Sequence, residues 1–374
     1  MGKLKLNDYV RLFLTMIVIP TLLCSSKVFA DETKQSAPNF LESKKEQTAF
    51  TLGQTKQYKV KHEVTLTPSN SNTFSRIIVD LPLPSNSPHQ KIDTNNAIVQ
   101  IQPIANVPMK VVAKNQYFEV IRTKPFGSRI IHIELKKPLP AEKWVISLEY
   151  SLNASNIHFN TQEAQNVKCI ELKKLDESFL PYLRPETLVE CRRPEFKNAL
   201  KEIFPAGINE QTDSIYDAAK KIYEWELKCC SYQLNSQQGR TEKLWGAFDM
   251  LNTKKGECGD YSALFIALCR VAGIPARPQV GFWAKQTNKV HVWAEFYVPS
   301  IGWIPVDPSV GAIAGKKEEY FGLIKDINNR VVVADSFDHI YGEQKIDFLQ
   351  TLNFRYWYDK SRVDLDAKYT FMAQ

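Results

Sequence analysis

Metal-binding patterns are absent from this sequence. Its 374 residues include only 7 cysteines and 6 histidines, with no Cys-x-x-Cys pair and no histidine cluster. The usual ligands of a zinc site are therefore missing. Acidic residues at the spacing of a calcium-binding loop are also missing, which argues against an obligatory calcium ion. No internal repeat or low-complexity tract occurs. The sequence therefore predicts a protein that needs no cofactor and no metal.

A strong excess of basic charge is missing too. The formal net charge is +7, and removing residues 1–30 takes away four basic residues and one acidic residue, which leaves +4. The lysines are scattered among acidic residues, whereas a nucleic-acid-binding protein gathers them on one face. We therefore expect no nucleic-acid partner.

Long apolar runs are limited to one, at the N-terminus. Three basic residues precede the stretch Leu12–Cys24, and Val28–Ala30 fits a cleavage site. The run is shorter than the roughly 20 residues of a membrane span, so an uncleaved anchor is the weaker alternative. Leucine is a poor residue before a lipid-modified cysteine, which disfavours Cys24 as a lipoprotein site. Residues 1–30 are thus predicted to be a signal peptide cleaved near Asp31. The mature protein would be periplasmic or secreted, without stable membrane insertion.

Six cysteines follow the predicted signal peptide. We expect Cys258 to stay free and Cys269 to be a buried core thiol. An exported protein can keep disulfides, and the remaining four cysteines allow three pairings that the sequence does not distinguish. These four are Cys169, Cys191, Cys229 and Cys230. Adjacent Cys229 and Cys230 are not expected to bond each other, and a metal site is the less favoured alternative.

The length suits two domains, and a hydrophobic fraction of 44% suits a globular core. Residues 31–55 are polar and predicted to be a flexible leader. Residues 56–155 contain short alternating runs separated by Asn, Ser, Pro and Gly, which predict an antiparallel β-sandwich. Residues 156–374 combine helical periodicity with later strands and predict a second domain with a C-terminal β extension. Three histidines fall on different elements of the sandwich and are expected to be solvated or core side chains: His62, His89 and His132.

Cys258 lies in the run KKGECGDYSALFIALCRVAGIPAR. Glycines bracket it, two lysines precede it, and apolar residues follow at helical spacing until Gly273-Ile274-Pro275. The thiol is therefore predicted in the first turn of a helix, near the positive end of the helix dipole. A thiolate is stabilised there, so we expect a thiol pKa below the free value of roughly 8.5. That setting is typical of a nucleophile.

A predicted hairpin downstream carries a histidine and an aspartate. The segment KVHVWAEFYVPSIGWIPVDPS reads as two short strands joined by a Pro-Ser-Ile-Gly turn. If odd positions pair, Tyr297 lies near Trp303 and Trp293 near Asp307, and His291 becomes the diagonal neighbour of Asp307. The carboxylate could then orient the imidazole. Cys258, His291 and Asp307 would form a nucleophile, a base and an orienting acid.

Each of these residues also has a structural interpretation. A buried helix cysteine, a satisfied core histidine and a turn aspartate before Pro308 would fit the positions one by one. Their joint occurrence favours catalysis. We expect Trp293 and Trp303 to pack in the core, and Trp245 as well, although its indole could donate near the site. The backbone N–H of Cys258 is one donor to an oxyanion, and the sequence does not identify a second.

These motifs resemble the transglutaminase-like superfamily of papain-like cysteine enzymes. The matching blocks are GECGDYSALFIALCRVAGIPARPQVGFW and HVWAEFYVPSIGWIPVDPS, with LPYLRPETLVE and EEYFGLIKDINNRVVV resembling flanking segments of bacterial members. The resemblance implies an α+β fold, with helices packed on an antiparallel sheet in a papain-like core, preceded here by the β-sandwich. It makes residues 156–374 a transglutaminase-like catalytic domain. It also places the family's catalytic cysteine, histidine and aspartate on Cys258, His291 and Asp307.

The resemblance implies acyl-enzyme chemistry on amide bonds of proteins or peptides. The thiolate would attack an amide carbonyl, His291 would protonate the departing amine, and a second nucleophile would release the acyl group. Water makes the enzyme a hydrolase and an amine makes it a transferase. The alternatives are a cysteine peptidase or amidase without cross-linking activity, and a non-catalytic envelope binding module. The substrate, the oligomeric state and the role of the first domain are not assigned by the sequence.

Overall fold

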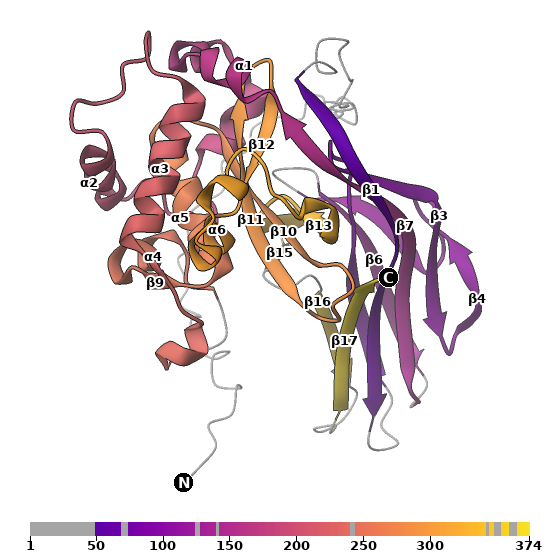
Figure 1. Ribbon diagram of the computed structural model, residues 1–374. Helices are drawn as coiled ribbons and strands as arrows, with labels where there is room; N and C mark the ends of the chain where they lie inside the picture. The colour runs from indigo at the N-terminus through magenta and orange to yellow at the C-terminus, as the bar shows by residue number, and fades with distance from the viewer. Residues whose placement is uncertain are drawn as a thin grey trace, which may run out of the picture. The chain divides into compact units, whose positions relative to one another are not determined.

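Two antiparallel β-sheets pack face to face, and most of their strands come from the first half of the chain (Figure 1). The computed structural model describes residues 49–68, 74–123, 128–139, 142–239, 244–341, 344–347, 353–358 and 365–374. One sheet has the order β17-β1-β7-β3-β4 and the other β16-β2-β6-β5. Their strands are β1 (Phe50–Pro68), β2 (Phe74–Leu83), β3 (Gln90–Gln102), β4 (Ala105–Lys110), β5 (Phe118–Arg122), β6 (Arg129–Leu139), β7 (Trp144–Phe159), β16 (Asn353–Tyr358) and β17 (Leu365–Ala373).

Alternation of apolar and polar residues explains the packing of these sheets. Along β1, Val60, Val64 and Leu66 are buried, while the residues between Val64 and its neighbours are only partly covered. They join Val79 of β2 and Ile133 of β6 in one hydrophobic core. A strand presents every second side chain to the same face, so one face of each sheet fills the space between them. The predicted antiparallel sandwich is observed, and β1 begins within the predicted leader.

The last strands of the chain pair with strands of the sandwich. β17 runs antiparallel to β1, with Val60 opposite Ala373 and Pro68 opposite Leu365. β16 runs antiparallel to β2. The predicted C-terminal β extension therefore adds one strand to each sandwich sheet. Residues Glu42–Gln374 form one compact unit, and the domain boundaries read from the sequence remain a prediction.

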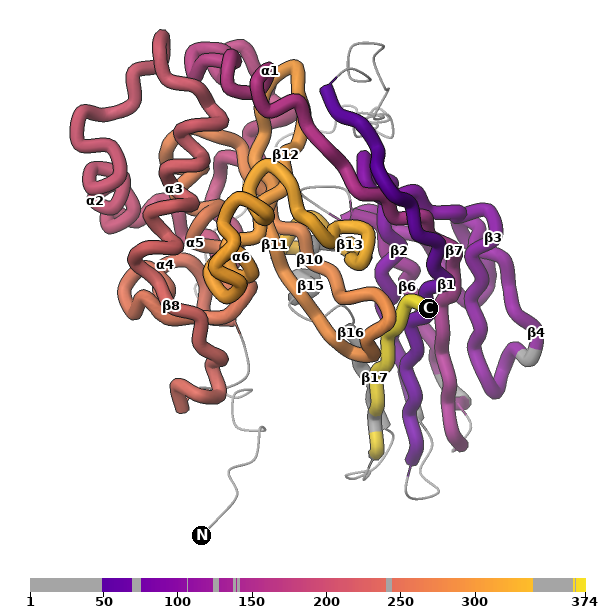
Figure 2. Tube along the Cα trace, in the orientation of Figure 1, coloured from indigo at the N-terminus to yellow at the C-terminus, as the bar shows by residue number. Residues whose placement is uncertain are grey.

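Helices cover an antiparallel sheet of order β12-β11-β10-β13 in the second half of the chain. Figure 2 shows α3, α4, α5 and α6 gathered on one side of this sheet, and α5 contacts both β10 and β11. The sheet strands are β10 (Ala276–Trp283), β11 (Val290–Val298), β12 (Gly302–Val306) and β13 (Arg330–Ala334). The helices are α1 (Thr161–Asn166), α2 (Pro194–Ile203), α3 (Ile215–Cys229), α4 (Ala247–Thr253), α5 (Cys258–Val271) and α6 (Pro308–Ala314). The α+β prediction is confirmed.

Short elements complete the described chain. The strands β8 (Ser231–Tyr232) and β9 (Lys255–Gly256) pair in parallel, and β14 (Asp338–Tyr341) pairs with β15 (Gln344–Asp347). The 3₁₀ turns are η2 (Cys169–Lys174), η3 (Glu177–Leu183), η4 (Asn235–Gln238), η5 (Lys317–Glu319) and η6 (Ile327–Asn329). Within the described ranges, the helices are too short or too polar to cross a bilayer. The predicted signal peptide lies outside the described residues.

Helix α5 is the central element of the second half. It is apolar on all sides, and every residue from Gly259 to Arg270 is buried, which is the pattern of a core helix. The helix ends before Gly273, whose φ of 80° is left-handed, and before Pro275, which cannot continue it. The predicted end is confirmed. The helix begins at Cys258, as its glycine-flanked sequence predicted.

Candidate functional site

The N-terminus of α5 is fixed by Asp260, which is 2% exposed. Its Oδ2 accepts a hydrogen bond from the Glu257 N–H at 3.2 Å. Its Oδ1 accepts from the backbone N–H groups of Trp245 at 2.7 Å and Gly246 at 2.9 Å. One carboxylate thus ties the preceding loop to the helix end that carries Cys258. Sequence analysis did not single out Asp260, although an acid two residues after Cys258 in a predicted helix was a visible signal.

Cys258 lies against strand β11, one residue beyond His291. The backbone N–H of Val292 donates a hydrogen bond to the thiol. The hydroxyl of Ser262 lies 2.9 Å from the Cys258 carbonyl oxygen and 3.1 Å from the Val292 carbonyl oxygen. The first turn of α5 is therefore bound to the strand that carries His291. Helix α5 and strand β11 therefore place the predicted nucleophile against the residue that follows the predicted base.

The prediction of a lowered thiol pKa is wrong for the resting protein. Burial raises the pKa of Cys258 to about 12, and the hydrogen bond from Val292 N–H offsets only part of that effect. The carboxylates of Glu257, Asp307 and Asp260 raise the pKa further. Burial and the nearby carboxylates raise the thiol pKa by more than the helix N-terminus lowers it. The thiol is therefore protonated at neutral pH and needs a base to become a nucleophile.

His291 and Asp307 form a buried pair at one end of the hairpin. His291 Nε2 lies 2.7 Å from Asp307 Oδ2, and the two residues are 6% and 0% exposed. Tyr297 faces Trp303 across the hairpin, and Ala294 faces Val306. The predicted register is therefore confirmed, and it brings a histidine near the start of β11 to an aspartate that follows β12.

Asp307 is held as an anion from several directions. Burial alone would raise the pKa of its carboxyl, but His291 and Arg330 attract the charge and hold the pKa below its usual range. Asp307 Oδ1 also accepts hydrogen bonds from the Val310 N–H at 3.0 Å and from the Ser309 hydroxyl at 2.9 Å. Asp307 is the N-cap of α6, which favours negative charge. The carboxylate is therefore ready to stabilise an imidazolium.

Arg330 is a site residue that the sequence analysis missed. Its Nη1 lies 2.5 Å from Asp307 Oδ2, and the side chain is fully buried. The guanidinium lies 4.5 Å from the centre of the Trp283 ring, and the His291 ring lies 4.9 Å from the same ring. The available signal was a single arginine opening the apolar strand RVVVA. The partner of that arginine is 23 positions away, so the sequence pattern does not reveal the contact.

Two exposed apolar side chains, Tyr232 and Ile313, lie on elements next to the candidate site. Tyr232 is 36% exposed and Ile313 is 60% exposed. Tyr232 lies on β8, which pairs with β9 directly before Glu257 and Cys258. Helix α6, which carries Ile313 and is capped by Asp307, contacts β8. The Tyr232 hydroxyl lies close enough to the Cys258 thiol for their charges to interact. The apolar surface formed by Tyr232 and Ile313 therefore lies on β8 and α6, the elements next to the site.

The remaining tryptophans and histidines considered in the sequence analysis make packing or hydrogen-bond contacts. Trp293 is fully buried, and Trp303 packs against Tyr182 with ring centres 4.8 Å apart. His62 contacts two tyrosine hydroxyls in the sandwich, and His132 pairs with Asp80 at 2.7 Å. His89 is buried. The Trp245 backbone bonds to Asp260, as described above.

The six cysteines in the described part of the chain are free thiols. Cys269 is fully buried, as predicted. Cys169 and Cys191 are also buried, and Cys229 and Cys230 are partly buried. The structure therefore contains none of the three disulfide pairings that the sequence left open. No group of three or more His, Cys, Asp or Glu residues in the described ranges could hold a metal ion.

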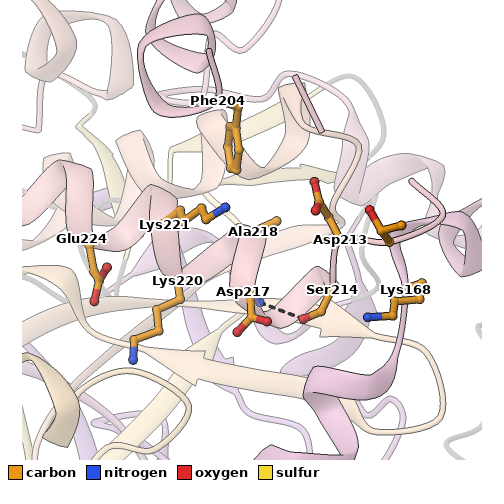
Figure 3. Close-up of a pocket in the computed structure, with 10 residues that line it drawn as sticks. Lys168, Phe204, Asp213, Ser214, Asp217, Ala218, Lys220, Lys221 and Glu224 are labelled. Atoms are coloured by element: carbon orange, nitrogen blue, oxygen red, sulfur yellow. Dashed lines mark hydrogen bonds between the residues drawn. The ribbon is translucent and has the colours of Figure 1, made fainter. Parts of the chain in front are cut away.

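A surface hollow of about 400 Å³ lies beside α3, away from Cys258 (Figure 3). Ser214 caps the helix there and accepts a hydrogen bond from the Asp217 N–H at 3.0 Å. The lining is mostly charged: Lys168, Phe204, Thr212, Asp213, Ser214, Asp217, Ala218, Lys220, Lys221 and Glu224. None of the three predicted catalytic residues lines this hollow.

Comparisons with known proteins relate part of the chain to one superfamily. Residues 204–308 match the family model of the transglutaminase-like superfamily. Protein YebA of Bacillus subtilis is 31% identical over 238 residues, which are 54% of this chain and 32% of that protein. A protein-glutamine gamma-glutamyltransferase of Pseudomonas aeruginosa is 31% identical over 71 residues, which are 16% of this chain and 11% of that protein. The chain spans about a third of the length of the first curated relatives it matches.

A solved structure shares the fold. A Cytophaga hutchinsonii protein, described provisionally as a cysteine protease, superimposes with a TM-score of 0.55 at 15% identity. The match covers 87% of this chain and 100% of that one, so it includes both the sandwich and the helical part. The matched span 204–308 contains Cys258, His291 and Asp307. Residues 204–308 therefore match the transglutaminase-like superfamily, as the sequence motifs predicted.

Proposed function

We propose that this protein is a thiol enzyme that transfers or hydrolyses acyl groups at amide bonds of proteins or peptides. Cys258 is the nucleophile, His291 is the base and Asp307 orients the imidazole. The observation that carries the proposal is the buried His291–Asp307 contact of 2.7 Å, with the thiol bound to the next amide of the same strand. The family match adds a cysteine-dependent reaction class.

The first half-reaction forms a thioester. Because Nε2 of His291 binds Asp307, Nδ1 is the nitrogen left to take the proton from Cys258. The sulfur bonds to the amide carbonyl carbon, and the carbonyl electron pair moves to oxygen. The Cys258 N–H, in the first turn of α5, is one donor to that oxyanion. When the oxyanion collapses, the C–N bond breaks and His291 protonates the leaving amine.

The second half-reaction releases the acyl group. Water or an amine loses a proton to His291 and attacks the thioester, and the thiol is restored. Asp307 stays ionised throughout and stabilises the imidazolium in both halves. The apolar surface around Tyr232 and Ile313 is suited to an apolar segment of the substrate. Exclusion of water by such a segment would favour the amine over hydrolysis.

Two assays on the same samples distinguish transfer from hydrolysis. Labelled-amine incorporation into a glutamine-containing protein reports transfer, and fluorescence release from a quenched peptide reports hydrolysis. We expect one or both signals in the wild-type protein and neither in Cys258→Ala. Full turnover in folded Cys258→Ala would contradict the assignment. A wild-type protein without either signal, and with an inert thiol, would favour the envelope binding module.

We also propose that the protein is exported, with residues 1–30 as a cleaved signal and residues 56–155 and 156–374 as its two domains. The support is the N-terminal sequence pattern and the sandwich. N-terminal sequencing of protein from the periplasm or medium should give a start near Asp31. Full-length protein with Met1 intact in the membrane fraction would favour an anchor.

A further inference from the structure

One carboxylate oxygen contacts both a histidine nitrogen and an arginine nitrogen at the centre of the site. Asp307 Oδ2 lies 2.7 Å from His291 Nε2 and 2.5 Å from Arg330 Nη1. Asp307 and Arg330 are fully buried, so water does not screen their interaction. The proton affinity of the His291–Asp307 pair therefore depends directly on the charge of Arg330.

Two indole rings hold the arginine and the histidine in place. The guanidinium of Arg330 lies 4.5 Å from the ring centre of Trp283 and 5.2 Å from that of Trp293. The His291 ring lies 4.9 Å and 5.9 Å from the same two rings. A guanidinium stacks well on aromatic faces. The two rings therefore fix the orientation of the Arg330 guanidinium.

The sandwich anchors the segment that carries Arg330. The Gln90 side chain donates to the Val332 carbonyl at 3.1 Å and accepts from the Val332 N–H at 2.9 Å. The Tyr58 hydroxyl donates to the Asn328 carbonyl at 2.9 Å. The ammonium of Lys56 donates to Asn329 Oδ1 at 2.6 Å. Strands β1 and β3 thus hold both sides of Arg330.

We propose that Arg330 is the positioning residue of this site, that it keeps Asp307 ionised and aimed at His291, and that the sandwich fixes Arg330 for this purpose. The inference rests on the proposed function of Cys258 and His291. It gives the first domain a role in the chemistry. Arg330 does not touch the reacting atoms and acts through Asp307.

The remaining charged and titratable groups around the pair belong to several elements. Asp326 binds the other arm of Arg330 at 2.9 Å. The groups that interact electrostatically with Asp307 or Arg330 from other elements are Cys258, Tyr223, Tyr232, Tyr320 and His89. All of them remain in an Arg330 variant. A change in pH dependence on replacing Arg330 therefore reports the loss of its own charge.

The test measures the rate of Cys258 alkylation by iodoacetamide as a function of pH, read by mass spectrometry of the Cys258 peptide. Removing a nearby positive charge raises the proton affinity of every group that feels it. In the plot of alkylation rate against pH, the rise of the rate on the acidic side (the acidic limb) should therefore move to higher pH in Arg330→Met, by about one to three pH units. Arg330→Lys keeps the positive charge, so its acidic limb should stay within about half a pH unit of the wild-type limb.

Arg277→Met is the matched control. Arg277 is a largely buried arginine of the same sheet, paired with Glu295 at 2.8 Å and Asp335 at 3.2 Å, and it lies outside the proposed machinery. Its loss should reduce stability and leave the acidic limb in place. A limb that moves equally in Arg277→Met and Arg330→Met would show a general effect of unfolding and overturn the inference.

Further outcomes test the positioning role and the proposed function separately. Folded Arg330→Met with a wild-type limb would overturn the positioning role. If Arg330→Met does not fold, Asp326→Asn is measured instead. Removing this negative charge should move the acidic limb to lower pH, and an unchanged limb would overturn the positioning role. A wild-type Cys258 that never reacts would instead contradict the proposed function, so the two failures are distinguishable.

Discussion

At the scale of single residues, the proposed activation of Cys258 depends on His291 and not on the position of the thiol on the helix. The first turn of a helix usually favours a thiolate, but burial raises the pKa of this thiol to about 12. His291, fixed by an ionised Asp307, is the group that can take the proton. In the proposed mechanism, the neutral thiol of the resting protein gives up its proton during attack.

Replacing His291 with alanine should make Cys258 slow to alkylate at neutral pH, by about 100-fold, because the thiol loses its base. Reactivity should return only in strongly alkaline solution, as the raised thiol pKa requires. Asp307→Asn should lose less, since the imidazole keeps a hydrogen-bond partner. Stopped-flow alkylation from pH 5 to 11 checks this. A wild-type rate in folded His291→Ala at pH 7 would show that the histidine is not the base.

Glu226 carries a second pH effect, on stability. It is fully buried in α3, and within the described residues neither carboxyl oxygen has a hydrogen-bond partner. Burial raises the pKa of Glu226 well above its usual value. Above roughly pH 4.3 the unfolded chain loses the proton while the folded chain keeps it. Stability therefore falls by about 1.4 kcal/mol per pH unit, until the folded pKa is reached.

Glu226→Gln should remove this dependence. The variant keeps the side-chain shape without the titration, so its advantage in free energy of unfolding over wild type should grow steadily from pH 5 to pH 7. Urea denaturation at several pH values measures the difference, and the other titrating groups cancel because both proteins share them. A difference that stays constant with pH would mean that Glu226 ionises normally in the fold.

At the scale of elements, the sequence predicted what depends on local spacing. Helix α5 starts at Cys258 and ends before Gly273-Ile274-Pro275 because those signals are contiguous in the chain. The β11–β12 register follows from alternation across a short turn. Arg330 and Asp260 depend on contacts between separate elements. The pKa of Cys258 depends on burial, which a one-dimensional pattern does not fix.

Cys269→Ala should reduce stability and spare activity. Cys269 lies on the same helix as Cys258 but is fully buried in the core, so losing the sulfur leaves a small cavity that costs about 1 kcal/mol. Cys258→Ala should show the reverse, with a nearly unchanged fold and no turnover. Thermal unfolding and amide turnover of the two variants give the comparison. Inactive but well-folded Cys269→Ala, beside active Cys258→Ala, would reverse the nucleophile assignment.

At the scale of the whole molecule, the C-terminal strand joins the sandwich to the loop before β11. β17 pairs with β1, and Phe371 and Ala373 are buried. The Lys285 N–H donates to the Ala373 carbonyl at 2.7 Å, and the Asn288 N–H to the Phe371 carbonyl at 3.1 Å. That loop leads directly to His291. The end of the chain therefore supports both the first sheet and the approach to the site.

Removing residues 365–374 should lower the melting temperature by more than about 5 °C, since buried apolar area and a strand ladder are lost together. Cys258 alkylation at neutral pH should slow as well. Lys368→Ala, at an exposed position of the same strand, is the control and should leave both quantities unchanged. A truncated protein with the wild-type melting temperature would show that β17 does not stabilise the sandwich.

The most direct test of the central claim is the intact mass of the protein after brief mixing with an activated acyl ester of a glutamine-like side chain. The account predicts one added acyl group, mapped to Cys258, which disappears when water or an amine is allowed to react. Cys258→Ala should gain no acyl group, and His291→Ala should gain it at least about 100-fold more slowly. An acyl group on another residue of the wild-type protein, or on folded Cys258→Ala at the wild-type rate, would contradict the claim.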